Sequence, residues 1–166
     1  MKATVLFCLS LIIGGPCWTS NAYSQIISDS VHSAAICRNY NASEATDIDY
    51  LPWAVRNLNS SSRYVICPLV VPIPPGGLID ESPYLISVNV EGSTRPNQSL
   101  TCTLFSHDAF GEFLGSDSFN IGSFTAFSYE LRVPAIAPTD ASVLCLLPGS
   151  AGGQLTELDL RLLPPN

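Results

Sequence analysis

The sequence predicts an all-β domain, an antiparallel β-sandwich of the jelly-roll or immunoglobulin-like kind, with about seven to nine strands and two disulfides. Three observations favour this class. Apolar and polar residues alternate with a period of two in several segments, turn-forming residues recur at short intervals, and no helical period extends beyond about two turns. A closed barrel is the second architecture that fits the same pattern.

The first 24 residues have the features of an export signal. Lys2 supplies a positive charge, residues 3–13 form an apolar run, and Gly14-Gly15-Pro16 ends it. Small residues before Tyr23 and Gln25 match the pattern of a signal-peptidase site. We therefore expect residues 1–24 to be removed and residues 25–166 to form a single domain that is secreted or periplasmic. The apolar run is too short to span a bilayer, so we expect no membrane span.

The charge of the chain limits its partners. The chain has 14 acidic and 7 basic residues, and one of the basic residues is Lys2 in the leader. The mature chain would then have six arginines, no lysine and a net charge near 6 − 14 = −8. Such a surface disfavours nucleic acid and anionic lipid, and the lack of lysine excludes a P-loop or a lysine Schiff base.

The cysteines predict disulfide bonds. Two of the six lie in the leader, which leaves an even number, four, in the mature chain. Three pairings are possible, and we favour Cys37–Cys67 with Cys102–Cys145 because each joins neighbouring segments. Zinc is the alternative, but there is no C-x-x-C pair and no histidine pair nearby. We expect no metal and no cofactor.

The first half of the mature chain yields four candidate strands. Residues 38–51 are polar and acidic and are expected to form a loop, and residues 72–83 are rich in proline and are expected to form a connection. The short polar turn at residues 59–62 predicts a hairpin between the strands on either side of it. The expected strands are 26–37, 53–58, 63–71 and 84–91.

The second half alternates more regularly. Cys102 is expected inward with Leu100 and Leu104, and Cys145 is expected inward with Val143 and Leu147. In the last strand, leucines alternate with charged residues. The glycine-rich residues 149–153 precede this alternating strand, so we interpret them as a hairpin turn and not as a phosphate-binding loop. The expected strands are 99–106, 110–119, 124–133, 142–147 and 156–162.

The chain contains the motifs Tyr50-x-x-x-Ala54-Val55-x-Asn57, Val65-Ile66-Cys67-Pro68-Leu69, Leu100-Thr101-Cys102-Thr103-Leu104 and Cys145-Leu146-Leu147-Pro148. With these four motifs it resembles a group of small exported bacterial β-sandwich proteins that contain disulfides and have no assigned function. The resemblance covers most of the mature chain, although Ala54 replaces the glycine usual in that group. It implies secretion, a β-sandwich and disulfides, and it implies no activity.

Catalytic patterns are weak. Ser106, His107 and Asp108 are the residue types of a hydrolase triad, but neighbours on a strand face opposite sides and cannot form a relay. Carboxylate pairs at residues 47/49 and 80/81, with others at 108, 112 and 117, suit calcium or glycoside hydrolysis, yet acidic residues in turns are usually solvated. We therefore expect no catalytic residues and no enzyme activity.

Three aromatic residues border the acidic segment: Tyr40, Tyr50 and Trp53. They are candidate ligand-binding residues, because exposed aromatics beside carboxylates bind sugars, although core packing of Tyr50 and Trp53 is the favoured interpretation. The leading functional hypothesis is a non-catalytic binding or structural sandwich with an unknown extracellular protein or glycan partner. The alternatives are a carbohydrate-binding or calcium-assisted recognition module and, third, a hydrolase with an unrecognised site.

Overall fold

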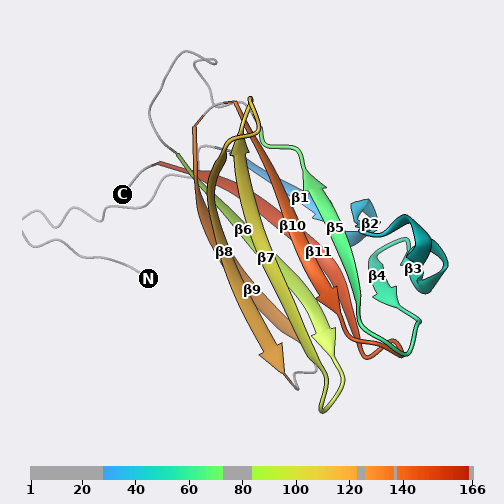
Figure 1. Ribbon diagram of the computed structural model, residues 1–166. Coiled ribbons are helices and arrows are strands. Elements are labelled where there is room, and N and C mark those ends of the chain that lie inside the picture. The colour runs from blue at the N-terminus through green and yellow to red at the C-terminus, as the bar shows by residue number, and fades with distance from the viewer. Residues whose placement is uncertain (1–27, 73–83, 123–125, 137, 165–166) are drawn as a thin grey trace, which may run out of the picture.

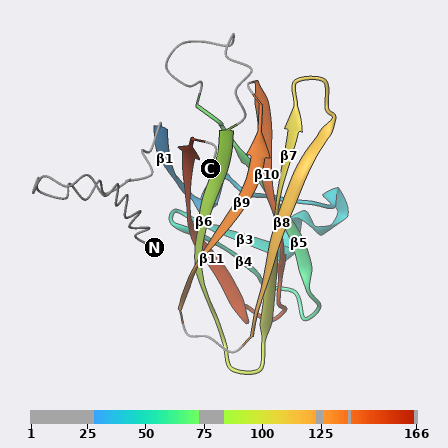
Figure 2. The ribbon, with the colours of Figure 1, turned by 90° about the vertical axis from the view of Figure 1, so that its left-hand side faces the viewer.

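The computed structural model describes residues 28–72, 84–122, 126–136 and 138–164. Within these ranges eleven β-strands form two antiparallel sheets that pack face to face, as Figures 1 and 2 show from two sides. The predicted β-sandwich with two disulfides is confirmed. The predicted leader at residues 1–24 lies outside the described residues. No helix within the described ranges is long and apolar enough to cross a membrane.

One sheet has six strands in the order β3-β4-β11-β6-β9, and β1 also pairs with β11. The strand β11 pairs with β4 through Gln154 and Leu155, and then with β1 over Ser28–Ser33. The strand β11 also pairs with β6, along most of the length of both strands. The bounds are β1 (Ser28–Ser33), β3 (Ile48–Leu51), β4 (Ala54–Asn57), β6 (Tyr84–Thr94), β9 (Phe127–Ala135) and β11 (Gly153–Leu163).

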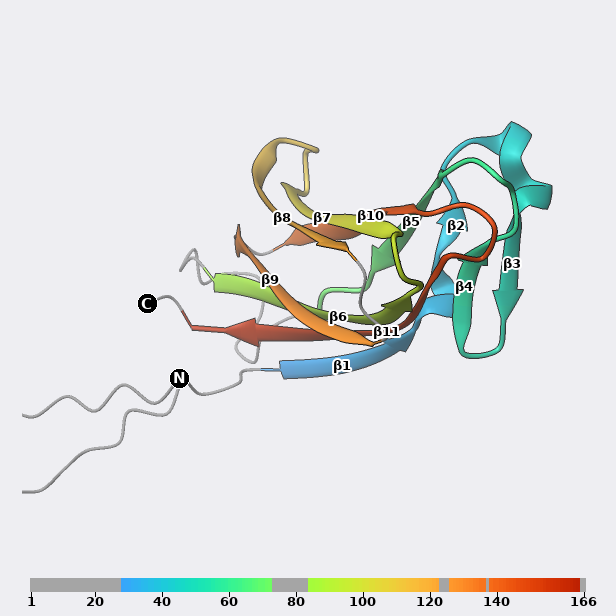
Figure 3. The same ribbon diagram turned by 90° about the horizontal axis from the view of Figure 1, so that it is seen from below.

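The second sheet has five strands in the order β2-β5-β10-β7-β8. Viewed from below, it forms the upper layer of the sandwich, opposite β6, β9 and β11 (Figure 3). Two 3-10 turns, η1 (Ala34–Ile36) and η2 (Ala42–Asp47), lie on either side of β2 in the chain. The strand bounds are β2 (Arg38–Asn39), β5 (Arg63–Leu69), β7 (Ser99–Asp108), β8 (Phe113–Gly122) and β10 (Thr139–Leu147).

The core forms where the alternating apolar residues of the two sheets meet. Strand side chains point alternately to opposite faces, so one face of each strand enters the core. The inward predictions for β7 and β10 are confirmed, since Leu100, Leu104, Val143 and Leu147 are fully buried. In the opposing sheet the large inward side chains are Ile86, Val88, Val90, Leu131, Leu158, Leu160 and Leu162.

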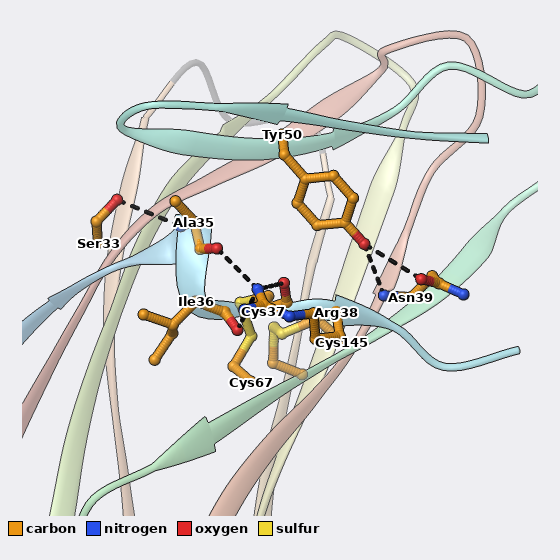
Figure 4. Close-up of a disulfide and its surroundings, with 10 residues drawn as sticks. Ser33, Ala35, Ile36, Cys37, Arg38, Asn39, Tyr50, Cys67 and Cys145 are labelled. Carbon is orange, nitrogen blue, oxygen red and sulfur yellow. Dashed lines mark hydrogen bonds between the residues drawn. A yellow bond between two sulfur atoms is a disulfide. The ribbon is translucent and has the colours of Figure 1, made fainter. Parts of the chain in front are cut away.

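Two disulfides strengthen the five-stranded sheet. The bonds are Cys37–Cys67 and Cys102–Cys145, which is the pairing that the sequence favours. Cys102 and Cys145 are direct partners across β7 and β10, whereas Cys37 ties the segment between η1 and β2 to β5. All four cysteines are fully buried. Cys67 on β5 is opposite Val143, two residues before Cys145 on β10, so the two bridges are neighbours in the sheet (Figure 4).

The predicted hairpin between residues 53–58 and 63–71 is wrong. The first segment becomes β4, which pairs with β3 and β11, and the second becomes β5, which pairs with β10 and β2. Residues 58–62 therefore cross from one sheet to the other. The predicted loop at residues 38–51 is also wrong, because it contains β2, η2 and β3. The tip of the β3–β4 hairpin is the Pro52-Trp53 turn.

The hairpin predicted around residues 149–153 is wrong as well, although a tight turn does form there. The turn has a hydrogen bond from the Gly152 amide to the Gly149 carbonyl (2.9 Å). It joins β10 and β11, which belong to different sheets and do not pair. The turn is a sheet-to-sheet crossing, like the segment before β5. The strand count exceeds the seven to nine expected because residues 38–51, predicted as a loop, contain the short strands β2 and β3.

Candidate functional site

The three predicted aromatic residues all lie on the surface. Tyr40 is 57% exposed, Tyr50 40% and Trp53 61%. The expectation that Tyr50 and Trp53 pack in the core is wrong, because the β3–β4 hairpin is at the sheet edge and buries Ala54 and Val55 instead. Large apolar rings are expensive to leave in water, so exposed ones are candidates for contact with a ligand.

Tyr50 has a structural contact that explains its place. Its hydroxyl accepts a hydrogen bond from the backbone amide of Asn39 (2.8 Å) and lies 3.4 Å from the side-chain Oδ1 of the same residue. Figure 4 shows the ring reaching from β3 toward β2. The contact joins the edge of one sheet to the edge of the other. Tyr50 therefore fixes the strand that precedes Tyr40, whereas Trp53 is on the turn of the same hairpin.

Tyr40 pairs with a tyrosine that sequence analysis missed. The Tyr40 amide donates to the Tyr64 carbonyl (3.0 Å), which extends the β2–β5 ladder by one residue. The two rings meet edge to face, with centroids 6.2 Å apart and planes at 63°. Tyr64 is 42% exposed. The signal was present in the sequence, since Tyr64 precedes Val65 in an alternating strand and must face away from the core.

Strand register extends this tyrosine pair into a row across the outer face of the five-stranded sheet. Tyr64 on β5 is opposite Leu146 on β10, which is opposite Thr101 on β7, which is opposite Asn120 on β8. The Asn120 amide donates to the Thr101 hydroxyl (2.6 Å). The neighbouring row on the same face consists of Ile66, Leu144, Thr103 and Ser118.

These two rows, together with Tyr40, form the surface that we call the tyrosine face. Its leucines and isoleucine are only half-buried, in contrast to the fully buried Val65 and Cys145 on the inner side of the same strands. The face is apolar and aromatic on β5 and β10 and carries hydroxyl and amide groups on β7 and β8. Aromatic rings provide flat contact area with little loss of side-chain entropy, and the polar groups orient a ligand.

The outer face of the other sheet is different, because it carries ion pairs on β9 and β11. Arg132 pairs with Glu130 (2.8 Å) and Arg161 pairs with Asp159. Burial raises the pKa of Glu130, but hydrogen bonds from Arg132 and Ser87 outweigh it and hold that pKa below its usual value. Among the described residues, this part of the sheet presents paired charges where the other sheet presents its row of aromatic and aliphatic side chains.

The adjacent Ser106, His107 and Asp108 face apart, as predicted. Ser106 points into the sandwich and its hydroxyl donates to the Pro134 carbonyl (2.8 Å). The His107 ring meets the Phe113 ring edge to face, with centroids 5.9 Å apart. The Asp108 carboxylate accepts from backbone amides of its own loop. A triad requires a nucleophile within hydrogen-bond reach of a base, and these three residues do not provide that arrangement.

The predicted carboxylate pairs are also divided among separate partners. Asp47 binds Arg63 (2.7 Å) and Asp49 binds Arg56 (2.7 Å). The hydrogen bond from Arg63 lowers the pKa of Asp47. Among the residues that the structure describes, no three His, Cys, Asp or Glu side chains are grouped as a metal would need. The pair at residues 80 and 81 lies outside them.

No protein-family model and no curated protein matches the chain. Solved structures share its fold. The C-terminal CBM6 of LamC, a marine laminarinase from Zobellia galactanivorans, is 12% identical with a TM-score of 0.51, and the match covers 81% of this chain and 99% of that one. A family 35 carbohydrate-binding module from Clostridium thermocellum is 11% identical with a TM-score of 0.50, covering 80% and 97%.

Proposed function

We propose that this protein is a non-catalytic carbohydrate-binding module and that the tyrosine face is its binding surface. The observation that carries the proposal is the exposed Tyr40–Tyr64 pair, which continues into a row of aliphatic, hydroxyl and amide side chains. Of the hypotheses drawn from the sequence, this one replaces the general binding or structural role. We propose no calcium assistance, because no three His, Cys, Asp or Glu side chains are grouped for a metal among the residues that the structure describes.

The chemistry of the tyrosine face suits a sugar. A pyranose ring has an apolar face of C–H groups and a rim of hydroxyls, so it needs an aromatic or aliphatic contact beside hydrogen-bonding groups. Tyr64 and Leu146 supply the first, and Thr101 and Asn120 supply the second, all in one row. The strands hold these side chains at fixed spacing, so little entropy is lost on binding.

Other observations support the proposal. Both fold neighbours above are carbohydrate-binding modules by name, and each is matched over nearly its whole length. Two buried disulfides are typical of proteins from oxidising compartments, where extracellular glycans occur. The carboxylates discussed above are held in separate ion pairs or turns, which supports binding without hydrolysis.

Affinity electrophoresis of the mature chain through gels that contain laminarin, xylan, β-mannan or β-1,4-galactan tests the proposal. At least one polysaccharide should retard the wild-type protein. Tyr64→Ala should weaken that retardation by about tenfold, which corresponds to the loss of one central aromatic contact. Phe110→Ala is the matched control, because Phe110 is 92% exposed but lies in the β7–β8 turn.

Trp53→Ala separates the tyrosine face from the hairpin that the sequence analysis also nominated. Because Trp53 lies on the β3–β4 turn, its replacement should leave retardation unchanged. Loss of binding in Trp53→Ala with full binding in Tyr64→Ala would move the site to the hairpin. Absence of retardation by all four polysaccharides would contradict the proposed function.

A further inference from the structure

A cleft of about 330 Å³ opens on the six-stranded sheet, on the opposite side of the sandwich from the tyrosine face. Its floor is a cross-strand row in which Arg56 on β4, Gln154 on β11 and Ser93 on β6 are direct partners. The wall is formed by Arg95 and Pro96, which follow β6, and by the turn before β11. We call it the arginine cleft.

The arginine cleft is a positive site on an acidic protein. Apart from Lys2, the permanently charged cationic side chains of this protein are its six arginines. Two of them line the cleft, and the lining contains no acidic residue. Arg56 is paired with Asp49 at 2.7 Å. Arg95 is exposed and donates to the Ser150 carbonyl at 3.4 Å, and no carboxylate forms an ion pair with it within the described ranges. Its charge is therefore available to an anion.

The turn that forms one wall is held in a fixed shape. Ser150 and Ala151 both adopt left-handed backbone conformations, with φ of 57° and 51°. Residues other than glycine rarely adopt this conformation, because it costs about 1 kcal/mol or more for each residue. Hydrogen bonds maintain the turn, because the Ala151 amide donates to the Asn57 carbonyl (2.7 Å) and the Arg95 amide to the Gly152 carbonyl (2.7 Å).

We propose that the arginine cleft binds one acidic sugar residue, a ring that carries a carboxylate or a sulfate. The guanidinium group of Arg95 meets the oxyanion, and Gln154 and Ser93 bind ring hydroxyls. Arg56 lines the floor but its charge is taken up by Asp49. A planar guanidinium forms two parallel hydrogen bonds to such an anion. The sugar identity rests on the proposed function, whereas the anion specificity rests on the cleft itself.

The size of the arginine cleft favours a single ring. Its volume is at the lower end of the range for small-molecule pockets, which runs from about 300 to 1,000 Å³. The tyrosine face is an open surface that suits a chain of neutral sugars. The two sites lie on different sheets, so they contact different parts of a glycan or different glycans.

Chemical-shift titrations of the ¹⁵N-labelled mature chain test the inference. The probes are galacturonate, galactose 6-sulfate, galactose and inorganic sulfate, each against wild type, Arg95→Gln, Arg132→Gln and Tyr64→Ala. Arg132→Gln is the matched control, because it removes the same charge from an exposed arginine on the same sheet. Shifts should occur at residues of the arginine cleft with one or both acidic sugars.

Arg95→Gln should weaken acidic-sugar binding by about tenfold, which is the usual effect of losing a charge-assisted hydrogen bond. Arg132→Gln and Tyr64→Ala should bind these sugars like wild type. The galacturonate and sulfate-sugar arms distinguish the two anions. The inference is overturned if neither acidic sugar binds, if galactose binds the cleft as well as they do, if inorganic sulfate binds as tightly as the sugars, or if Arg95→Gln and Arg132→Gln behave alike.

Failure of this inference is distinguishable from failure of the proposed function. Retardation by a neutral polysaccharide depends on Tyr64 and not on Arg95. If the protein binds a neutral polysaccharide through Tyr64 but binds no acidic sugar, the proposal for the arginine cleft fails and the tyrosine face remains the binding site.

Discussion

Asn57 joins the two sheet-to-sheet crossings, and its replacement by alanine should cost about 3 kcal/mol of unfolding free energy. The side chain is fully buried. Its amide nitrogen donates to the carbonyls of Ser61 (2.7 Å), Leu147 (3.3 Å) and Pro148 (3.3 Å). Its oxygen accepts from the Asn59 amide (2.9 Å). One amide thereby fixes the entry to β5 and the exit from β10.

The magnitude follows from what alanine leaves behind. The two short hydrogen bonds contribute about 1 kcal/mol each, and the two carbonyls that share the longer contacts lose a buried donor, which costs about 1 kcal/mol more. Asn57→Asp should be worse than Asn57→Ala at neutral pH, because it places a carboxylate against three carbonyl oxygens.

Urea unfolding followed by circular dichroism measures this prediction. At an unchanged slope, a loss of about 3 kcal/mol lowers the midpoint by roughly 1 to 3 M. Asn120→Ala is the control, because that exposed amide makes one surface hydrogen bond to Thr101, and it should change the free energy by less than about 0.5 kcal/mol. Equal midpoints for Asn57→Ala and Asn120→Ala would refute the role given to Asn57.

Three further predictions concern stability. Ala151→Gly relieves a left-handed residue with φ of 51° and should raise the free energy of unfolding by about 1 kcal/mol, read as a higher melting temperature. The hydrogen bond from Arg63 lowers the pKa of Asp47, so the ion pair stabilises the fold above the unfolded pKa near 3.8 and is lost as the pH falls through the folded pKa. In urea unfolding, the free energies of unfolding of wild type and Asp47→Asn should therefore differ at about pH 7 and converge near about pH 2. Replacing both Cys102 and Cys145 by alanine removes a bridge that spans 43 residues and restricts the unfolded chain, so it should cost about 4 kcal/mol, measured calorimetrically without reductant. A loss below about 1 kcal/mol would contradict this stabilising role.

Much of the fold was predictable because burial imposes a period of two. The alternation in β7 and β10 identified which side chains enter the core and placed Cys102 and Cys145 on inward faces. The even number of cysteines predicted bridges, and the preference for joining neighbouring segments favoured the observed pairing. Pairing partners were less predictable. A short polar turn is compatible with a hairpin, and nothing local to residues 59–62 shows that Asn57 contacts Leu147 and Pro148, 90 and 91 residues away.

The candidate site was predictable in part. Alternation in β5 requires Tyr64 to face outward, but its row with Leu146 and Thr101 depends on a strand order that the sequence does not specify. The exposure of Trp53 was mispredicted, because aromatic residues usually enter cores and because residues 38–51 were expected to form a loop, so the β3–β4 hairpin was not anticipated. The arginine cleft combines residues from three distant segments and has no local sequence signal.

Chemical-shift mapping with a neutral oligosaccharide tests the central claim most directly. The probe is the hexasaccharide of whichever of the four polysaccharides retards the protein most. We predict that the largest backbone shifts occur in β5, β7 and β10 around Tyr64, Leu146 and Thr101. Tyr64→Ala should require about tenfold more sugar to reach the same shifts. Shifts confined to the β3–β4 hairpin, or none at saturating sugar, would contradict the account.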